Sequence, residues 1–194
     1  MHKRGFSNNY VEKAVNSFGT KVLVRVGCVD ASDCQVAESF LSRLTLAWKD
    51  CPEPIKSTID KPVVKLCDSP DENFEQIQST MSTQVTLASL KANAGNLIML
   101  HAGGIADLHG GVAVLVGPSG RGKTTTTRFL AQSYGYVSDE TIAIKKDGEV
   151  VPYRKPLSII EKGYKYKRQI APSDLGLLSL PESKLQLRGI AECG

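Results

Sequence analysis

The hydrophobic and polar positions of the first 95 residues alternate between strand and helix patterns, which predicts an N-terminal α/β subdomain over residues 1–95. Residues 21–28 alternate apolar and polar side chains, as in a half-buried strand. Residues 33–49 predict an amphipathic helix, and Ser32 with Gln35 has the form of a capping box before it. The apolar positions of this helix are Val36, Phe40, Leu44, Ala47 and Trp48. Residues 1–20 are polar and weakly patterned, so they predict no element.

The next stretch predicts a short strand and two helices. Residues 62–67 form the strand candidate, and residues 68–71, which contain a proline, predict a turn. The apolar spacing from Phe74 to Met81 predicts one helix, and a second, weaker helix is expected over 83–93. Gly95 would end it, because glycine readily adopts the left-handed conformation that commonly follows a helix.

Residues 96–194 predict a second unit with several short strands. Apolar runs predict buried strands at 97–100 and 111–116 and a further strand at 105–108, three in all. A turn at 109–111 leads into the third strand, and residues 124–133 predict a helix. Residues 141–151 predict a β-hairpin, because its arms alternate and its turn contains Asp-Gly.

A glycine-rich run at 117–124 stands between the strand 111–116 and the helix after it. The run fits G-x-x-x-x-G-K-[ST], the phosphate-binding loop of nucleoside triphosphatases. Its glycines let several backbone N–H groups point at one anion at a helix N-terminus. Lys123 would add a charge for the β- and γ-phosphates, and Thr124 a hydroxyl for Mg²⁺. The predicted nucleotide-binding residues are Gly117, Pro118, Ser119, Gly120, Arg121, Gly122, Lys123, Thr124 and Thr125.

Phosphoryl transfer beside such a loop needs a carboxylate that orients the metal or accepts a proton. Asp139 and Glu140 follow the loop helix at the edge of a strand, where they would face the γ-phosphate. An exposed acidic turn is the alternative for this pair. His101 stands before a glycine pair, and its spacing alone indicates a structural histidine.

The composition is that of a globular chain and indicates neither a nucleic-acid partner nor a membrane span. Its 194 residues allow one domain with a substantial appendage, and the hydrophobic fraction of 41% and charged fraction of 23% are ordinary. No run approaches the roughly 18 apolar residues that cross a bilayer, and no apolar core follows the basic N-terminus. We therefore expect no membrane span and no signal peptide. A net charge of +4 does not demand nucleic acid.

The cysteines predict a reduced, cytoplasmic protein. They are five in number, an odd count, and form no C-x-x-C pair, which argues against a secreted disulfide framework. A metal loop between Cys28 and Cys34 would lack a histidine or a second cysteine pair. Buried thiols are therefore expected at these positions.

The chain from Pro152 onward is basic and interleaved with tyrosines. A solvated face is the ordinary interpretation of such a run, and a surface that holds an acidic or peptide substrate is the alternative. Its cationic residues are Arg154, Lys155, Lys162, Lys165, Lys167 and Arg168.

Four runs together, at 100–107, 111–116, 117–124 and 135–140, resemble the catalytic domain of HPr serine kinase/phosphorylase. The similarity is greatest to the wider group of HPr-kinase-like proteins, which share their core with phosphoenolpyruvate carboxykinase, and it covers about residues 97–160. The resemblance implies an α/β P-loop kinase core with ATP and Mg²⁺ as cofactors. It places the active site on His101, Lys123, Thr124, Asp139 and Glu140, with Glu140 as proton acceptor and Asp139 on the metal side.

The chain departs from that family at two positions. It has Asp139-Glu140 where the family has two aspartates, and Gln186 where a Glu-Ile-Arg-Gly motif of the family supplies a Mg²⁺-binding glutamate. By the resemblance Gln186 would be a neutral Mg²⁺ ligand. The chain ends soon afterwards, so we expect the family's C-terminal elements to be missing, as in a truncated chain or a reduced homologue.

Three functions are compatible with these features. The first is a kinase that transfers the γ-phosphoryl group of ATP to a hydroxyl, such as serine, of a peptide, protein or small molecule. The second is a nucleotide-binding regulatory protein with little turnover, which Gln186 and the short C-terminal part favour. The third is an ABC-type transport ATPase, but its L-S-G-G-Q signature and apolar Walker B strand are absent. The expected partners are a nucleotide and an unidentified acceptor, and a homo-oligomer stays open.

Overall fold

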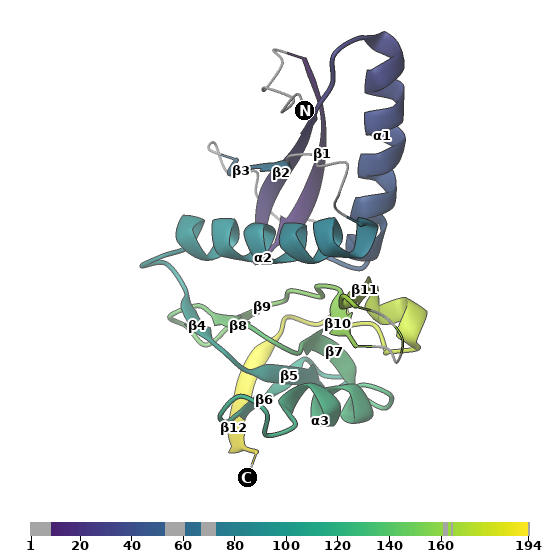
Figure 1. Cartoon of the computed structure of the whole chain (residues 1–194). Helices are drawn as coiled ribbons and strands as arrows, with labels where there is room; N and C mark the ends of the chain where they lie inside the picture. The colour runs from purple at the N-terminus through teal and green to yellow at the C-terminus, as the bar shows by residue number, and fades with distance from the viewer. Residues whose placement is uncertain (1–8, 53–60, 67–72, 161–162, 164, 194) are drawn as a thin grey trace.

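The N-terminal part of the molecule is a small sheet covered by two helices (Figure 1). The computed structural model describes residues 9–52, 61–66, 73–160, 163 and 165–193. The sheet has the order β1-β2-β3, with strands Tyr10–Ser17, Thr20–Gly27 and Val63–Leu66. β1 is antiparallel and β3 parallel to β2. The prediction of no element before residue 20 is wrong, because β1 is held by its pairing with β2 and carries no alternating pattern of burial.

The first predicted helix is confirmed as α1 (Ala31–Thr45), which a 3₁₀ turn, η1 (Leu46–Trp48), extends. The predicted capping box is wrong: Asp30 is the N-cap, and its Oδ1 accepts a hydrogen bond from the backbone N of Asp33 at 2.9 Å. The predicted buried face is confirmed for Leu44, Ala47 and Trp48 and is wrong for Val36. Val36 is 66% exposed, whereas Ala37 and Leu41 are buried.

One continuous helix, α2 (Phe74–Ala92), replaces the two helices that the sequence predicted. No glycine or proline interrupts these 19 residues, so the chain stays helical across the predicted break between residues 81 and 83. The helix also buries a polar residue: Gln78 is buried, and its side chain donates a hydrogen bond to the Leu44 carbonyl at 3.1 Å. Gly95 follows the helix with φ of +80°, as the terminator prediction requires.

A four-stranded sheet of order β12-β6-β5-β7 organises the C-terminal part. Its strands are β5 (Gly103–Ala106), β6 (Gly111–Val116), β7 (Gly135–Ser138) and β12 (Gln186–Glu192). β6 lies inside the sheet, parallel to β12 and antiparallel to β5, and β5 is antiparallel to β7. The carboxyl ends of β6 and β7 and the amino end of β5 therefore meet at one edge of the sheet. That edge carries the helix α3 (Lys123–Leu130).

Two smaller pairings complete the C-terminal part. β4 (Ile98–Leu100), β8 (Ile142–Ile144) and β9 (Val150–Val151) form an antiparallel sheet, which confirms the predicted hairpin. β4 is confirmed as a strand but not as a buried one, because Ile98 is 56% exposed. β10 (Leu157–Ile159) and β11 (Arg168–Ile170) form a second hairpin, which is followed by the 3₁₀ turn η2 (Pro172–Leu175).

The two parts share a hydrophobic core, and α2 runs between them (Figure 1). The buried side chains of the N-terminal sheet and helices form one cluster that also includes Ala143 and Tyr153 from the C-terminal part. The rings of Phe18 and Tyr153 pack with their centroids 4.4 Å apart. The mixed α/β fold that the sequence predicted is therefore present. No helix among the described residues has the length and apolar character needed to span a membrane.

The expectation of reduced thiols is wrong for one pair: Cys28 and Cys34 form a disulfide bond. Cys28 follows β2, and the chain turns at once into α1, whose first turn contains Cys34. This return brings their Cα atoms within 5.0 Å, a proximity that the spacing of the cysteines alone does not indicate. Cys51 is a buried free thiol, as expected. Cys67, Lys162 and the turn predicted at 68–71 lie outside the described residues.

Candidate functional site

The glycine-rich run lies where the motif requires it, between the end of β6 and the start of α3. Gly122 is the left-handed N-cap of α3, with φ of +82°, and Lys123 is the first helical residue. Gly117 lies close to the residue that follows β12, because a Cβ atom on Gly117 would lie 2.9 Å from the Cys193 carbonyl oxygen. The predicted order of strand, loop and helix is therefore present.

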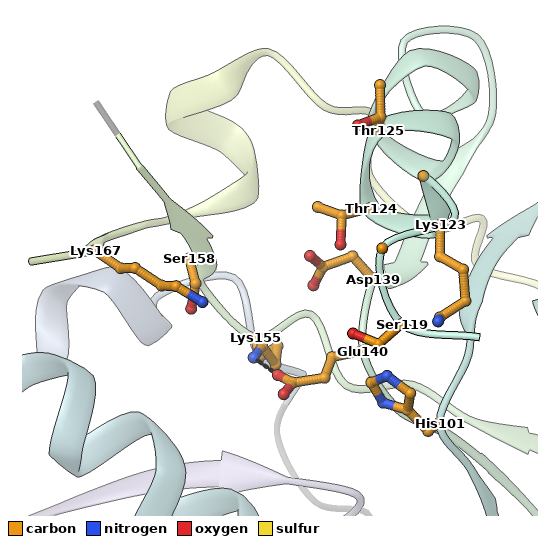
Figure 2. A pocket seen from close by; sticks show the side chains of 12 residues that line it. His101, Ser119, Lys123, Thr124, Thr125, Asp139, Glu140, Lys155, Ser158 and Lys167 are labelled. Carbon is orange, nitrogen blue, oxygen red and sulfur yellow. Dashed lines mark hydrogen bonds and ion pairs between the residues drawn. The ribbon is translucent and has the colours of Figure 1, made fainter. Parts of the chain in front are cut away.

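A pocket of about 410 Å³ opens beside this loop (Figure 2). It brings together predicted residues from three connections at one edge of the sheet: His101 before β5, the loop after β6, and Asp139 with Glu140 after β7. The predicted loop residues Gly117, Pro118 and Arg121 do not line it. Its lining residues are His101, Ser119, Gly120, Gly122, Lys123, Thr124, Thr125, Asp139, Glu140, Lys155, Ser158 and Lys167.

Lys123 is held inside its own loop. Its side chain is buried, and Nζ donates hydrogen bonds to the carbonyl oxygens of Gly117 at 2.7 Å and Pro118 at 3.0 Å. An ammonium group has three hydrogens, so this arrangement leaves one for a further acceptor. A phosphate oxygen bound to the loop N–H groups would lie on this side of the pocket.

Asp139 is buried and oriented by a tyrosine. Its Oδ1 accepts a hydrogen bond from the Tyr136 hydroxyl at 2.9 Å. Burial and the Asp139 charge raise the pKa of Tyr136 well above its usual value, so the phenol stays protonated and remains a donor. Asp139 accepts no other hydrogen bond from a described side chain. Asp139 and Thr124 both line the pocket, so a carboxylate and a hydroxyl are available there (Figure 2).

Glu140 forms an ion pair with Lys155 across the floor of the pocket. Lys155 is 3% exposed, whereas the Glu140 side chain is 47% exposed. Burial acts to raise the pKa of Glu140, but the charge and hydrogen bond of Lys155, together with the charges of His101 and Lys167, outweigh burial, so the net pKa is lowered. Burial also opposes the charge of Lys155, yet the two carboxylates Glu140 and Asp139 hold its pKa above the usual value. Both partners are therefore ionised at neutral pH.

The glycine pair after His101 allows close packing on β5, of α3 at Gly103 and of β8 at Gly104. A Cβ atom at Gly103 would collide with Oγ1 of Thr127, and one at Gly104 would lie 2.6 Å from Cδ1 of Ile142. Such contacts leave no room for a larger residue. The backbone N of Ala102 donates to the Glu140 carbonyl at 3.1 Å, which fixes the segment that carries His101 beside the acidic pair.

The prediction of Gln186 as a Mg²⁺ ligand is wrong. β12 runs parallel to β6, with Gln186 opposite Gly111 at the end of the sheet far from the loop. The Gln186 amide donates instead to the Asp147 carbonyl at 2.9 Å. The opposite end of β12 reaches the loop, where the Cys193 N donates to the Val116 carbonyl.

The basic run after Pro152 was expected to be a solvated face, and for two residues this is wrong. Arg154 and Lys155 are buried. The Arg154 guanidinium donates to the carbonyls of Tyr136 at 2.9 Å and Leu178 at 2.7 Å. Sequence reasoning therefore missed Lys155 as a pocket residue. The signal was local: apolar or ring residues surround these cations, at Tyr153, Pro156 and Leu157, and all three are buried.

The oxygen groups of the pocket suit a Mg²⁺ ion that arrives with a nucleotide. Among the described residues, no group of three or more His, Cys, Asp or Glu side chains could hold a metal ion. Mg²⁺ is commonly bound through one or two carboxylates together with substrate phosphates and water. Asp139 and Thr124 provide a carboxylate and a hydroxyl for such an ion.

A scan against protein-family models finds no model that matches this chain, and a search among curated proteins finds no match.

Proposed function

We propose that this chain is an ATP-dependent kinase with an HPr-kinase-like P-loop core, and that it transfers the γ-phosphoryl group to a hydroxyl of a peptide, protein or small molecule. The observation that carries the proposal is the pocket itself, where a glycine loop, its lysine and hydroxyl, and two carboxylates converge from separate segments. Phosphoryl transfer depends mainly on positioning and charge neutralisation, and this set of groups supplies both.

The loop side would bind the triphosphate. The N–H groups at the start of α3 and the Lys123 ammonium would hold the β- and γ-phosphates, while Thr124 and Asp139 would hold the Mg²⁺ ion that neutralises them. Tyr136 would keep the Asp139 carboxylate in place through its hydrogen bond. His101, at the same edge of the sheet, would lie near the transferred phosphate.

Glu140 would act on the acceptor. Its carboxylate would take the proton of the acceptor hydroxyl as that oxygen bonds to the γ-phosphorus and the bond to the β-phosphate oxygen breaks, which releases ADP. The ion pair with Lys155 keeps Glu140 ionised, which a proton acceptor requires. A carboxylate with a lowered pKa is a weak base. The hydrogen bond from Lys155 to the Glu140 carboxylate must therefore weaken or break before that carboxylate accepts the proton.

That ion pair also favours a second candidate, a nucleotide-binding regulatory protein with little turnover. If Lys155 holds Glu140 permanently, the pocket would bind Mg-ATP and lack a free proton acceptor. Nucleotide binding would then serve to order the pocket, and no group would be transferred.

Single-turnover transfer from γ-labelled ATP to serine-containing peptides tests the kinase proposal. We expect Glu140→Gln to bind nucleotide as the parent does and to transfer about 10²- to 10⁴-fold more slowly. Glu38→Gln, at an exposed position on α1, is the control and should transfer at the parent rate. Equal rates for the parent and Glu140→Gln would exclude Glu140 as the base. Nucleotide binding by the parent without any transfer would support the regulatory alternative.

A further inference from the structure

The wall of the pocket opposite the loop is built by the β10–β11 hairpin. Ser158 pairs with Gln169 across the hairpin, and its neighbour Leu157 is fully buried on the other face. Lys167 directly precedes β11 and lines the same pocket. Figure 2 shows the side chains of Ser158 and Lys167 on this wall, with Lys123 on the opposite side of the pocket.

The Ser158 hydroxyl is held by a buried amide. Gln169 is buried, and its Nε2 donates to Ser158 Oγ at 3.0 Å, while Oγ lies 3.2 Å from Gln169 Oε1. The shorter bond uses Ser158 as an acceptor. The hydroxyl hydrogen can therefore turn from Oε1 toward a ligand in the pocket without loss of the bond that positions Ser158.

Among the lysines that line this pocket, Lys167 is the one whose ammonium makes no hydrogen bond or ion pair with another described residue. Lys123 donates to loop carbonyls and Lys155 is paired with Glu140. Lys167 makes no ion pair with a described residue, although its charge contributes to the lowered pKa of Glu140. Figure 2 shows Lys167 beside Ser158 and across the pocket from Lys123, so it lies on the side where the acceptor would bind and not beside the loop.

From this geometry we infer that the phosphate acceptor carries a carboxylate close to its reacting hydroxyl, and that Lys167 and Ser158 bind this carboxylate. The inference rests on the proposed kinase function, since it assigns the acceptor half of the same pocket. An ammonium and a hydroxyl donor together match the two oxygens of a carboxylate. The cationic wall would also orient the acceptor so that its hydroxyl faces Glu140 and the γ-phosphate.

The test compares amidated peptides in which one serine is flanked on both sides by Asp, Asn or Lys. A further peptide places its only carboxylate at a free C-terminus, which separates a terminal carboxylate from a side-chain one. Two quantities are measured with Mg-ATP: the KM and kcat of transfer, and the peptide affinity by fluorescence anisotropy with Mg-ADP present. The variants are Lys167→Gln and Lys167→Glu, with Lys165→Gln as the matched control. Lys165 is exposed, stacks on Tyr166 and does not line the pocket.

We expect the parent to prefer a carboxylate-bearing peptide over the Asn peptide by about fivefold in KM, as for an ion pair at an exposed lysine. Lys167→Gln should abolish this preference and leave the KM of ATP unchanged. Lys167→Glu should shift the preference to the Lys peptide, because the same position would then repel a carboxylate. Lys165→Gln should behave as the parent.

Three results would overturn the inference. Equal affinity of the parent for the Asp, Asn and free-carboxylate peptides would remove the carboxylate subsite. A higher KM for ATP in Lys167→Gln, with peptide selectivity retained, would make Lys167 a nucleotide ligand. Loss of selectivity in Lys165→Gln as well would reduce the effect to general surface charge. Selective binding without transfer would instead contradict the kinase proposal and leave the subsite in place, so the two failures are distinguishable.

Discussion

The ion pair between Lys155 and Glu140 should respond unequally to the loss of either partner. In Glu140→Ala, the Lys155 ammonium stays almost completely buried and loses its paired carboxylate. Removing one partner of a buried pair costs about 3–5 kcal/mol of the free energy of unfolding, and the nearby Asp139 charge would offset part of it. We therefore expect a loss of about 3 kcal/mol.

In Lys155→Met, the buried charge itself is removed and the methionine retains much of the packing of the lysine stem. The carboxylate left behind belongs to Glu140, whose side chain is about half exposed and can be hydrated. The expected loss is therefore about 1 kcal/mol or less.

Urea unfolding at pH 7 measures both free energies. Lys145→Met, which breaks the more exposed pair with Glu149, is the control and should change stability by at most about 1 kcal/mol. If Lys155→Met destabilises the protein as much as Glu140→Ala, the unequal burial of the two partners does not govern their energetics. The reasoning would also be refuted if Glu140→Ala were as stable as the parent.

Three further predictions follow from the structure. The stability that the ion pair contributes should depend on pH: Glu140, with its lowered pKa, contributes above the unfolded carboxyl pKa of about 4.3 and loses this as pH falls through its folded pKa. The difference in unfolding free energy between the parent and Lys155→Met should therefore shrink in acid, and a constant difference from pH 7 to pH 2 would contradict this. Gln186→Ala should leave the Mg²⁺ dependence of nucleotide binding unchanged, because Gln186 lies at the end of the sheet far from the loop. If titration calorimetry shows that nucleotide binding by this variant depends less on Mg²⁺, Gln186 is a Mg²⁺ ligand after all. Gly103→Ala should lower the melting temperature, because the added methyl meets Thr127. The double variant Gly103→Ala, Thr127→Ala should recover part of this loss, and no recovery would show that the two side chains do not clash.

The strand, loop and helix around Lys123 could be predicted because they depend on local sequence. A short apolar run, glycines that turn the backbone and a helix start occur in one continuous stretch. The helix α1 could also be predicted from local sequence, but its N-cap could not, since Asp30 and Ser32 are both residues that commonly cap helices.

The features that the sequence did not predict depend on tertiary pairing. The direction of β12 decides that Gln186 lies far from the loop, and nothing in the local sequence shows whether that strand runs parallel or antiparallel to β6. The burial of Lys155 has a local sign in its buried neighbours, but its place in the pocket depends on the ion pair with Glu140, 15 residues earlier in the chain. The Cys28–Cys34 bond likewise depends on how closely α1 follows β2.

The central claim is that the pocket beside the glycine loop binds Mg-ATP through Lys123. Isothermal titration of Mg-ATP into the parent and into Lys123→Ala tests it most directly, with Lys146→Ala, an exposed position remote from the pocket, as the control. We predict that the parent and Lys146→Ala bind with the same affinity and that Lys123→Ala binds at least about tenfold more weakly, the loss of one charge-assisted contact. Absence of binding by the parent, or equal affinity in Lys123→Ala, would contradict the claim.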